Sequence, residues 1–195
     1  MKSLVAGLAL IALALPAHAD TTLFQDNFDT NGGGLNTVPA GWTVTDGTVD
    51  VIGAGTGWDY VPGSGKFLDL DGTSGLAGTL SVSLNMVAGQ HYSAFFDLAG
   101  SQVRNDAESV AVSFGAASGT YSLPRTAGWT HFALDFTPTS TGLYSLSFKN
   151  AGGDNVGMLL DNVTVTAAVP EPETYAMLLA GLGVVAAARR RKSRT

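Results

Sequence analysis

Apolar and polar residues alternate along most of the chain between Asp20 and Ala168, which is the pattern of half-buried β-strands. The clearest stretch is Thr79–Met86, where every second residue is apolar and the residues between them are Thr, Ser or Asn. The same alternation predicts strands at residues 91–98, 110–114, 132–136, 144–148 and 157–166, with shorter ones at 24–28, 42–45, 48–52 and 66–70.

Glycine-containing dipeptides separate these stretches, and signals for a helix are nearly absent from this part of the chain. Asp46-Gly47, Ala88-Gly89, Ala99-Gly100 and Thr141-Gly142 each predict a tight turn that closes a hairpin. About ten short strands with tight turns and no helix predict an all-β fold, an antiparallel β-sandwich of the jelly-roll type.

The N-terminal end has the pattern of a secretory signal peptide. Lys2 supplies a positive start, residues 4–15 are apolar, and Pro16 breaks the run before the cleavage site Ala17-His18-Ala19. An uncleaved membrane anchor is the alternative, and the helix-breaking Pro16 argues against it. We therefore expect a signal peptide at 1–19 and a single domain at 20–168.

The C-terminal end, residues 169–195, consists of three consecutive blocks. Pro170-Glu171-Pro172 is extended, residues 175–188 are apolar, and a basic cluster with Arg189, Arg190 and Arg191 follows. An apolar run that ends in arginines enters a membrane with its basic end on the cytoplasmic side. Its fourteen residues are fewer than the ~20 of a full span, and snorkelling arginines would extend its reach as a transmembrane helix.

This order of blocks resembles the PEP-CTERM protein-sorting signal of Gram-negative bacteria. The resemblance implies recognition of Pro170, Glu171 and Pro172 by a membrane-embedded exosortase, with Arg189, Arg190 and Arg191 as the stop-transfer cluster. It also implies passage through the inner membrane, removal of the tail, and a final place at the cell surface or in the extracellular matrix. A plain C-terminal anchor preceded by a proline linker is the alternative.

The exported part is strongly acidic. All sixteen Asp and Glu residues lie within 20–173, where only Lys66, Arg104, Arg125 and Lys149 oppose them, so the net charge there is −12. Nucleic acid and anionic lipid are poor partners for such a surface, whereas cations such as calcium suit it. The chain has no cysteine, so its stability rests on an apolar core or a metal rather than on disulfides.

A second resemblance covers most of the body. It is to galactose-binding-like jelly rolls, which include bacterial carbohydrate-binding modules, and it is carried by Asn27-Phe28-Asp29, Trp42, residues 66–72, residues 88–92, Trp129 and residues 160–163. The resemblance implies that the first and last strands lie side by side and hold a structural calcium ion between them.

The calcium ligands that this resemblance implies are Asp29 and Asp161, with Asp26 and Asp71 as further candidates. Calcium binds six to eight hard oxygens, and carbonyl groups of glycine-rich loops would complete the shell. The alternative is that these aspartates cap turns or face solvent.

Trp58 and Tyr60 are the candidate ligand-binding residues. They lie in the glycine-rich stretch 53–65, where no alternation assigns them to a core, and a flat aromatic ring stacks on the apolar face of a sugar. Trp42 and Trp129, at the starts of strands, are expected in the core.

Signals for catalysis are weak. His91 and His131 fall within strands, and no zinc-protease, serine-hydrolase or phosphate-binding motif occurs. We therefore expect a non-enzymatic exported protein that binds exopolysaccharide. A structural biofilm or matrix protein without specific sugar binding is the alternative, and a polysaccharide hydrolase with a carboxylate pair stays open.

Overall fold

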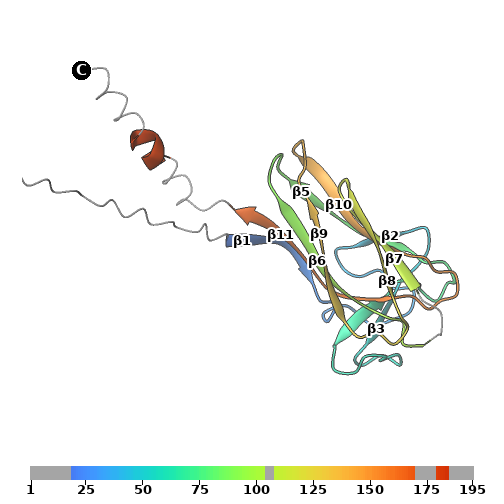
Figure 1. The fold of residues 1–195 in the computed structure, drawn as a ribbon. Helices are drawn as coiled ribbons and strands as arrows, with labels where there is room; N and C mark the ends of the chain where they lie inside the picture. Colours follow the sequence, from blue (N-terminus) through green and yellow to red (C-terminus); the bar gives the residue numbers. More distant parts are fainter. Residues whose placement is uncertain (1–18, 104–107, 170–178, 185–195) are drawn as a thin grey trace, which may run out of the picture. The chain divides into compact units, whose positions relative to one another are not determined.

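Two antiparallel β-sheets pack face to face around an apolar core in the computed structural model of the chain (Figure 1). The structure describes residues 19–103, 108–169 and 179–184. Residues 20–168 form a compact unit, and the buried apolar residues of the described chain lie between Phe28 and Ala167. This unit therefore has a core of its own and can fold without the terminal segments. The predicted antiparallel sandwich is confirmed.

Within the described residues, the first sheet has six strands and the second has five. In the first sheet the order is β3 (Asp50–Gly53), β4 (Lys66–Asp69), β11 (Leu159–Val169), β6 (Tyr92–Ala99) and β9 (Thr130–Phe136), and β1 (Ala19–Asp26) pairs with β11. In the second sheet the order is β2 (Thr43–Thr45), β5 (Thr79–Met86), β10 (Gly142–Asn150), β7 (Glu108–Phe114) and β8 (Ala117–Leu123).

Burial follows the alternation of the sequence. In β5 the side chains of Leu80, Val82 and Met86 are buried between the sheets, while Ser83 and Asn85 on the opposite face are exposed. This arrangement is what one buried and one solvated face of a sheet requires. Trp42 is buried as expected, and its ring packs against Phe24, Phe28 and Phe148.

One strand was not expected from the sequence. The inward positions of β8 include Ala117 and Gly119, whose side chains are too small to produce a clear apolar alternation. This strand forms because it pairs along its whole length with β7, across the short turn at Gly115. Sheet pairing therefore decides a strand that side-chain pattern does not indicate.

The predicted hairpins at Asp46-Gly47, Ala88-Gly89, Ala99-Gly100 and Thr141-Gly142 are wrong. At each of these four places the chain crosses from one sheet to the other, so the strands on either side do not pair. Asp46 and Gly89 do have the positive φ angles typical of tight turns. Such residues make the chain reverse, but packing of the two sheets decides whether the flanking strands pair.

The first and last strands of the body lie side by side, as the second resemblance implies (Figure 1). The pairing of β11 with β6 is interrupted by a β-bulge between Asp161 and Thr164. Asn162 lies in this bulge with a φ of 50°, a left-handed conformation that asparagine adopts more readily than most residues. The bulge begins at Asp161, one of the aspartates for which calcium binding is expected.

Residues 179–184 form a short helical segment with exposed side chains. In the part of the chain that the structure describes, no helix combines the length and the apolar character that crossing a membrane needs. Of the transmembrane helix expected at 175–188, the structure describes only residues 179–184. The expected signal peptide, apart from its last residue, and the sorting residues Pro170, Glu171, Pro172, Arg189, Arg190 and Arg191 lie outside the described residues.

Candidate functional site

A cavity of about 240 Å³ lies among the long loop between β3 and β4, the ends of those strands and the loop that precedes β11. It is lined by two aromatic, two acidic, two uncharged polar and three aliphatic residues, namely Trp58, Tyr60, Asp50, Asp69, Thr73, Asn155, Leu35, Ile52 and Val156. The fold thus brings both aromatic residues singled out in the sequence to one hollow of the surface.

The loop that carries the two aromatic residues is anchored at its base. The Ala54 amide donates to the Gly65 carbonyl at 2.8 Å, and the Gly53 amide donates to the Trp58 carbonyl at 3.0 Å. The Thr56 hydroxyl donates to the Gly53 carbonyl at 2.7 Å and accepts from the Trp58 amide at 3.1 Å. Gly53 has a φ of 103°, and a Cβ there would collide with the Gly65 carbonyl. These bonds hold the Trp58 backbone in place before any ligand arrives.

The rings of Trp58 and Tyr60 remain partly open to solvent. Trp58 is 40% exposed and Tyr60 is 37% exposed, so each ring presents part of its surface at the cavity. Burial, followed by the negative charges of Asp69 and Asp50, raises the pKa of Tyr60 above its usual value. The Tyr60 hydroxyl therefore stays protonated at neutral pH and can both donate and accept a hydrogen bond.

The two carboxylates of the cavity differ in how their oxygens are used. Asp50 accepts bonds from the backbone and hydroxyl of Thr73 and from the Asn36 amide, so both of its oxygens have partners. Asp69 accepts from the amides of Asp71 at 2.9 Å and Gly157 at 2.8 Å, both at Oδ1. No described residue donates to Asp69 Oδ2, which is the oxygen available to the cavity.

Burial raises the pKa of the Asp69 carboxyl well above its usual value. The two backbone hydrogen bonds oppose this effect, and the nearby charges of Asp50 and Asp71 add to it. A buried carboxyl group that faces other carboxylates is stabilised by a proton or by a cation. The cavity therefore has an acidic wall whose charge is not balanced by the protein.

Asp71 lies beneath this wall and fixes the loop before β11. Its Oδ2 accepts from the amides of Gly153 at 2.7 Å and Asp154 at 3.2 Å. Its Oδ1 is buried and has no hydrogen-bond partner in the described part of the chain. A side chain on Gly152 would collide with the Asp71 carboxylate, so this close approach requires glycine. We call this contact of Asp71 with residues 152–154 the latch; it fixes the loop that carries Asn155 to the cavity.

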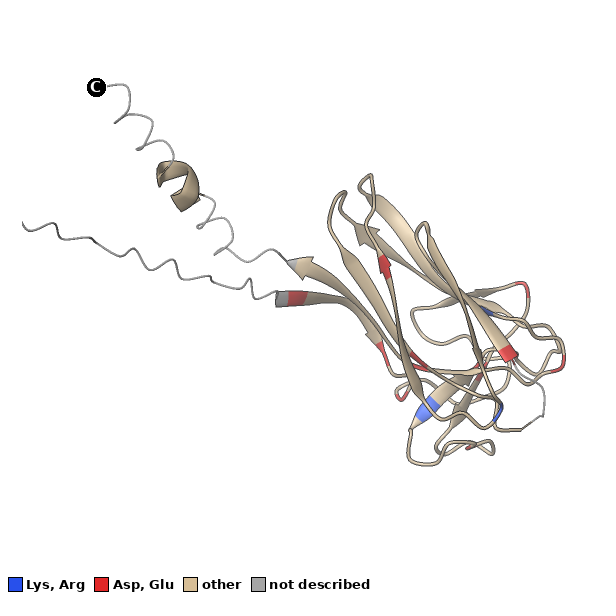
Figure 2. Ribbon diagram, in the orientation of Figure 1, with Lys and Arg blue, Asp and Glu red and all other residues tan. Residues whose placement is uncertain are grey.

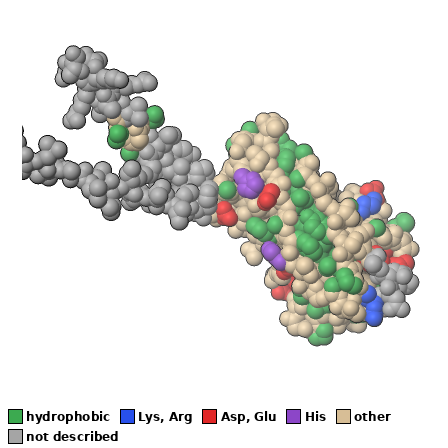
Figure 3. Space-filling view, in the orientation of Figure 1, with side chains coloured by type: hydrophobic (Ala, Val, Ile, Leu, Met, Phe, Trp, Pro, Cys, Tyr) green, Lys and Arg blue, Asp and Glu red, His purple; other side chains and the backbone are tan. Residues whose placement is uncertain are grey.

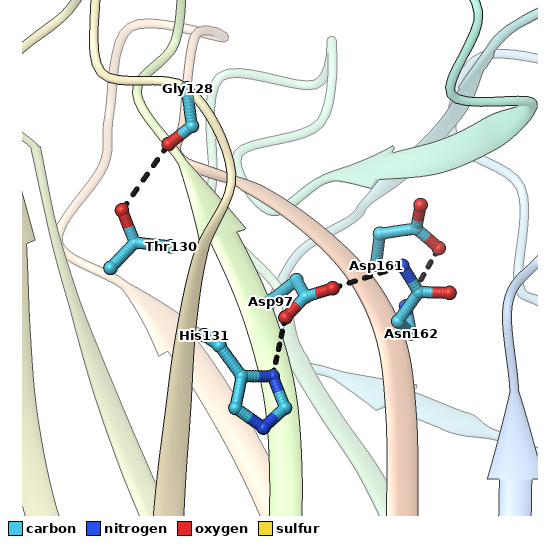
Figure 4. A network of polar contacts seen from close by, with 6 residues as sticks. All are labelled: Asp97, Gly128, Thr130, His131, Asp161 and Asn162. Atoms are coloured by element: carbon cyan, nitrogen blue, oxygen red, sulfur yellow. Dashed lines mark hydrogen bonds and ion pairs between the residues drawn. The ribbon is translucent and has the colours of Figure 1, made fainter.

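A second group of carboxylates surrounds the bulge in β11 (Figure 4). The Asn162 amide donates to Asp161 Oδ1 at 2.7 Å, and the Asn162 side chain donates to Asp97 Oδ2 at 2.9 Å. The other oxygen of Asp97 bonds His131 Nδ1 at 2.7 Å. Asp161 is 3% exposed, and its one hydrogen-bond donor among the described residues is this adjacent amide.

The pKa of Asp161 is raised to about 7, chiefly because the carboxyl group is buried. The Asn162 amide lowers this pKa, and the negative charges of Asp29, Asp97 and Asp26 each raise it. Three of the four candidate calcium ligands, Asp26, Asp29 and Asp161, are therefore electrostatic neighbours. Asp71 is not one of them and belongs to the latch beneath the cavity.

Asp26 and Asp29 already have protein donors. Asp26 accepts from the Phe28 amide at 2.7 Å and from Trp42 Nε1 at 2.9 Å. Asp29 accepts from the Lys66 amide at 2.8 Å and from the Asn27 side chain at 2.8 Å. In residues 19–103 and 108–169, no three His, Asp or Glu side chains converge as a metal site would need. A cation at Asp161 would therefore need backbone carbonyls for most of its shell.

Comparison with known proteins places the body of the chain in a family. Residues 22–166 match the model of a family described as "Protein of unknown function (DUF642)". The chain belongs to the DUF642 family. Residues 168–192 match the PEP-CTERM protein-sorting motif, which confirms the interpretation of the tail. The motif indicates export and sorting to the surface by an exosortase. No curated protein matches the chain.

Solved structures share the fold of the DUF642 body. One is the K3 cleaved adhesin domain of Lys-gingipain from Porphyromonas gingivalis, with a TM-score of 0.54, 12% identity, and coverage of 76% of this chain and 99% of that one. Another is the CBM22-1 xylan-binding domain of Xyn10C from Paenibacillus barcinonensis, with a TM-score of 0.53, 13% identity, and coverage of 80% and 99%. At such identities the likeness concerns the fold, and it confirms the predicted jelly roll.

The two histidines of the DUF642 body, His91 just before β6 and His131 in β9, do not line the cavity. Figure 3 shows histidine side chains at the surface of the described chain. His91 lies 3.7 Å from Asp135, and the ring of His131 stacks on Phe95 with ring centres 5.7 Å apart. Both histidines are largely exposed, as expected of side chains on a solvated sheet face. His91 Nδ1 also lies 3.3 Å from the Thr137 hydroxyl, and neither histidine lines the cavity.

Sequence reasoning missed three residues of the cavity, Asp50, Asp69 and Asn155. A carboxylate inside a short strand of otherwise apolar residues, as in Asp50–Gly53, is a signal that could have indicated Asp50. Asp69 lies within residues 66–72, which contribute to the second resemblance, but that resemblance implies no role for it. Asn155 carries no local signal, since loop packing alone brings it to the cavity.

Proposed function

We propose that this DUF642 domain is an exported, non-catalytic module that binds a polysaccharide of the cell surface or matrix through the cavity at Trp58 and Tyr60. The observation that carries the proposal is the presence of two partly exposed rings beside polar acceptors in one preformed hollow. Aromatic rings contact the apolar faces of sugars, and Asp or Asn oxygens bond their hydroxyl groups. The shared fold with a xylan-binding domain and an adhesin domain supports this function.

The first test is the variant Trp58→Ala, measured by glycan-array binding and by affinity electrophoresis in polysaccharide gels. We expect affinity to fall at least about tenfold, as on loss of an aromatic anchor. Trp58 is 40% exposed and lies in a loop, so the variant should keep the fold. Leu76→Ala is the matched control, since Leu76 is 63% exposed and does not line the cavity. Equal binding by Trp58→Ala and the unmodified domain would contradict the proposal.

We also propose that Asp161 binds a structural calcium ion, together with backbone carbonyls near the end of β1. The support is a buried carboxylate with one donor, surrounded by the negative charges of Asp26, Asp29 and Asp97. Calcium would supply positive charge at this point and hold β1 against β11. We expect the domain to melt at a lower temperature in EDTA than with added calcium. An unchanged melting curve would contradict calcium binding and would indicate that the Asp161 side chain is stabilised by a proton instead.

A further inference from the structure

The cavity at Trp58 and Tyr60 has a charge imbalance that bears on the kind of sugar it accepts. Its described walls contain two carboxylates, Asp50 and Asp69, and no Lys, Arg or His side chain. Lys66, at the start of β4, does not line the cavity and donates its ammonium to the Asp29 carbonyl at 2.8 Å. A ligand that enters the cavity therefore meets negative charge without a compensating cation from the walls.

The aromatic rings of the cavity also favour a positively charged ligand. The negative potential of Asp69 and Asp50 reaches the Tyr60 hydroxyl. The faces of Trp and Tyr rings attract ammonium groups through their quadrupoles, most strongly where water is partly excluded. Trp58 and Tyr60 line the cavity together with these carboxylates. An ammonium group at this place would gain from both kinds of interaction.

The free carboxylate oxygen of the cavity, Asp69 Oδ2, is also suited to an ammonium donor. Both oxygens of Asp50 are occupied by Thr73 and Asn36, whereas Asp69 keeps Oδ2 available. A hydrogen bond between a charged donor and a carboxylate is about twice as strong as a neutral one. Burial favours the protonated form of Asp69, and a bound ammonium group would shift it to the ionised form because a nearby cation stabilises the carboxylate. An acidic sugar would instead place its own negative charge beside Asp50 and Asp69, which is unfavourable because like charges repel at short range.

We propose that the cavity selects a sugar unit with a free amino group, and so binds a partly or fully de-N-acetylated hexosamine polymer in preference to N-acetylated, neutral or acidic polysaccharides. This inference rests on the proposed glycan-binding function and specifies its ligand class. The volume of about 240 Å³ is below the ~300–1,000 Å³ usual for drug-sized ligands, which suits one sugar unit with the rest of the polymer outside.

The test compares three oligosaccharides of equal length, made of glucosamine, of N-acetylglucosamine and of glucose, with the purified domain 20–168. Isothermal titration at about 0.15 M salt limits the long-range attraction of a polycation to an acidic protein. We expect the glucosamine oligomer to bind about tenfold more tightly than the other two, the gain of one charge-assisted hydrogen bond.

The variant Asp69→Asn should remove this preference, because it keeps the shape and the Oδ1 acceptor but removes the charge. Asp135→Asn is the matched control, since it removes the same charge from an exposed position outside the cavity. Tyr60→Leu serves as a second variant that leaves the buried carboxylates intact, and it should reduce the preference about threefold.

Equal or tighter binding of the N-acetylated or glucose oligomer would overturn the amino-sugar inference but leave glycan binding intact. A loss of preference in Asp135→Asn as large as in Asp69→Asn would also overturn it, because it would show general attraction to an acidic surface. Insensitivity of all three oligosaccharides to Trp58→Ala would instead contradict the proposed function itself.

Discussion

Asp161 is a carboxylate that the bulge in β11 removes from water. The ionised form loses hydration there and gains only one amide donor, while Asp29, Asp97 and Asp26 add negative charge nearby. The folded protein therefore keeps the Asp161 proton up to a pKa of about 7, whereas the ordinary value is 3.8. This difference between the folded and unfolded states makes stability depend on pH.

Without calcium, we expect the domain to lose stability as the pH rises from about 4 to about 7. In this range the unfolded chain releases the Asp161 proton and the folded domain retains it, so a higher pH favours unfolding. The loss is on the order of a few kcal/mol, because each unit of pKa difference corresponds to about 1.4 kcal/mol and solvent screens part of the effect. The raised pKa of Asp69 acts in the same direction. Urea unfolding in EDTA, measured across this range, checks the prediction.

Asp161→Asn should flatten the part of this dependence that Asp161 contributes, and added calcium should do the same in the unmodified domain. A bound cation favours the ionised carboxylate, so the folded state would then release its proton at a lower pH. Identical pH profiles for Asp161→Asn and the unmodified domain would show that Asp161 does not carry the effect.

At the scale of elements, two loops complete a cavity to which β3 contributes Asp50 and Ile52 and β4 contributes Asp69. The β3–β4 loop supplies Trp58 and Tyr60, and the loop before β11 supplies Asn155. The second loop is held by amide donors that point at the buried oxygens of Asp69 and Asp71. A buried carboxylate that accepts backbone amides fixes a loop more rigidly than exposed side-chain contacts do.

We expect Gly157→Ala to loosen this loop and to weaken glycan binding. A Cβ at this position would lie 2.6 Å from the Asp71 amide nitrogen and 2.9 Å from Asp69 Oδ1, so the backbone would have to move. The cost is about 1–3 kcal/mol of unfolding free energy. Denaturant unfolding and the affinity measurement described for Trp58→Ala check both effects.

Gly128→Ala is the control for this prediction, since a Cβ there meets no atom within 4 Å. It should leave stability unchanged or raise it by a few tenths of a kcal/mol, because alanine restricts the unfolded chain. If Gly157→Ala and Gly128→Ala behave alike, the close packing of the latch does not contribute to stability.

At the scale of the whole domain, charge is distributed unevenly between the two sheets (Figure 2). Both carboxylate groups involve strands of the first sheet and the loops next to them. The outer face of the second sheet instead carries a row of hydroxyl groups that crosses all five strands, Thr43, Ser81, Ser147, Ser113 and Ser118. The acidic character of the exported domain is therefore concentrated where ligand and cation binding are proposed.

The sequence predicted nearly every strand and the class of fold, but apart from the neighbouring first and last strands it did not predict which strands pair. The alternation in Thr79–Met86 involves only eight consecutive residues, so it can be recognised without knowing the rest of the fold. The turn at Asp46-Gly47 is equally local, yet the chain there passes between sheets. Similarly, Trp58 and Tyr60 could be identified from their loop, whereas Asp50 and Asp69 could not be assigned to the same cavity.

The sequence by itself determined the features that depend on neighbouring residues, namely the alternating strands, the apolar and basic order of the sorting tail, and the exposed aromatic loop. Only the tertiary structure decided that Asp50, Asp69 and Asn155 meet Trp58, and that Asp161 lies among other carboxylates. The physical reason is that these approaches join residues distant along the chain. They are set by how two sheets pack over a shared core, and by the burial that this packing imposes on the carboxylates.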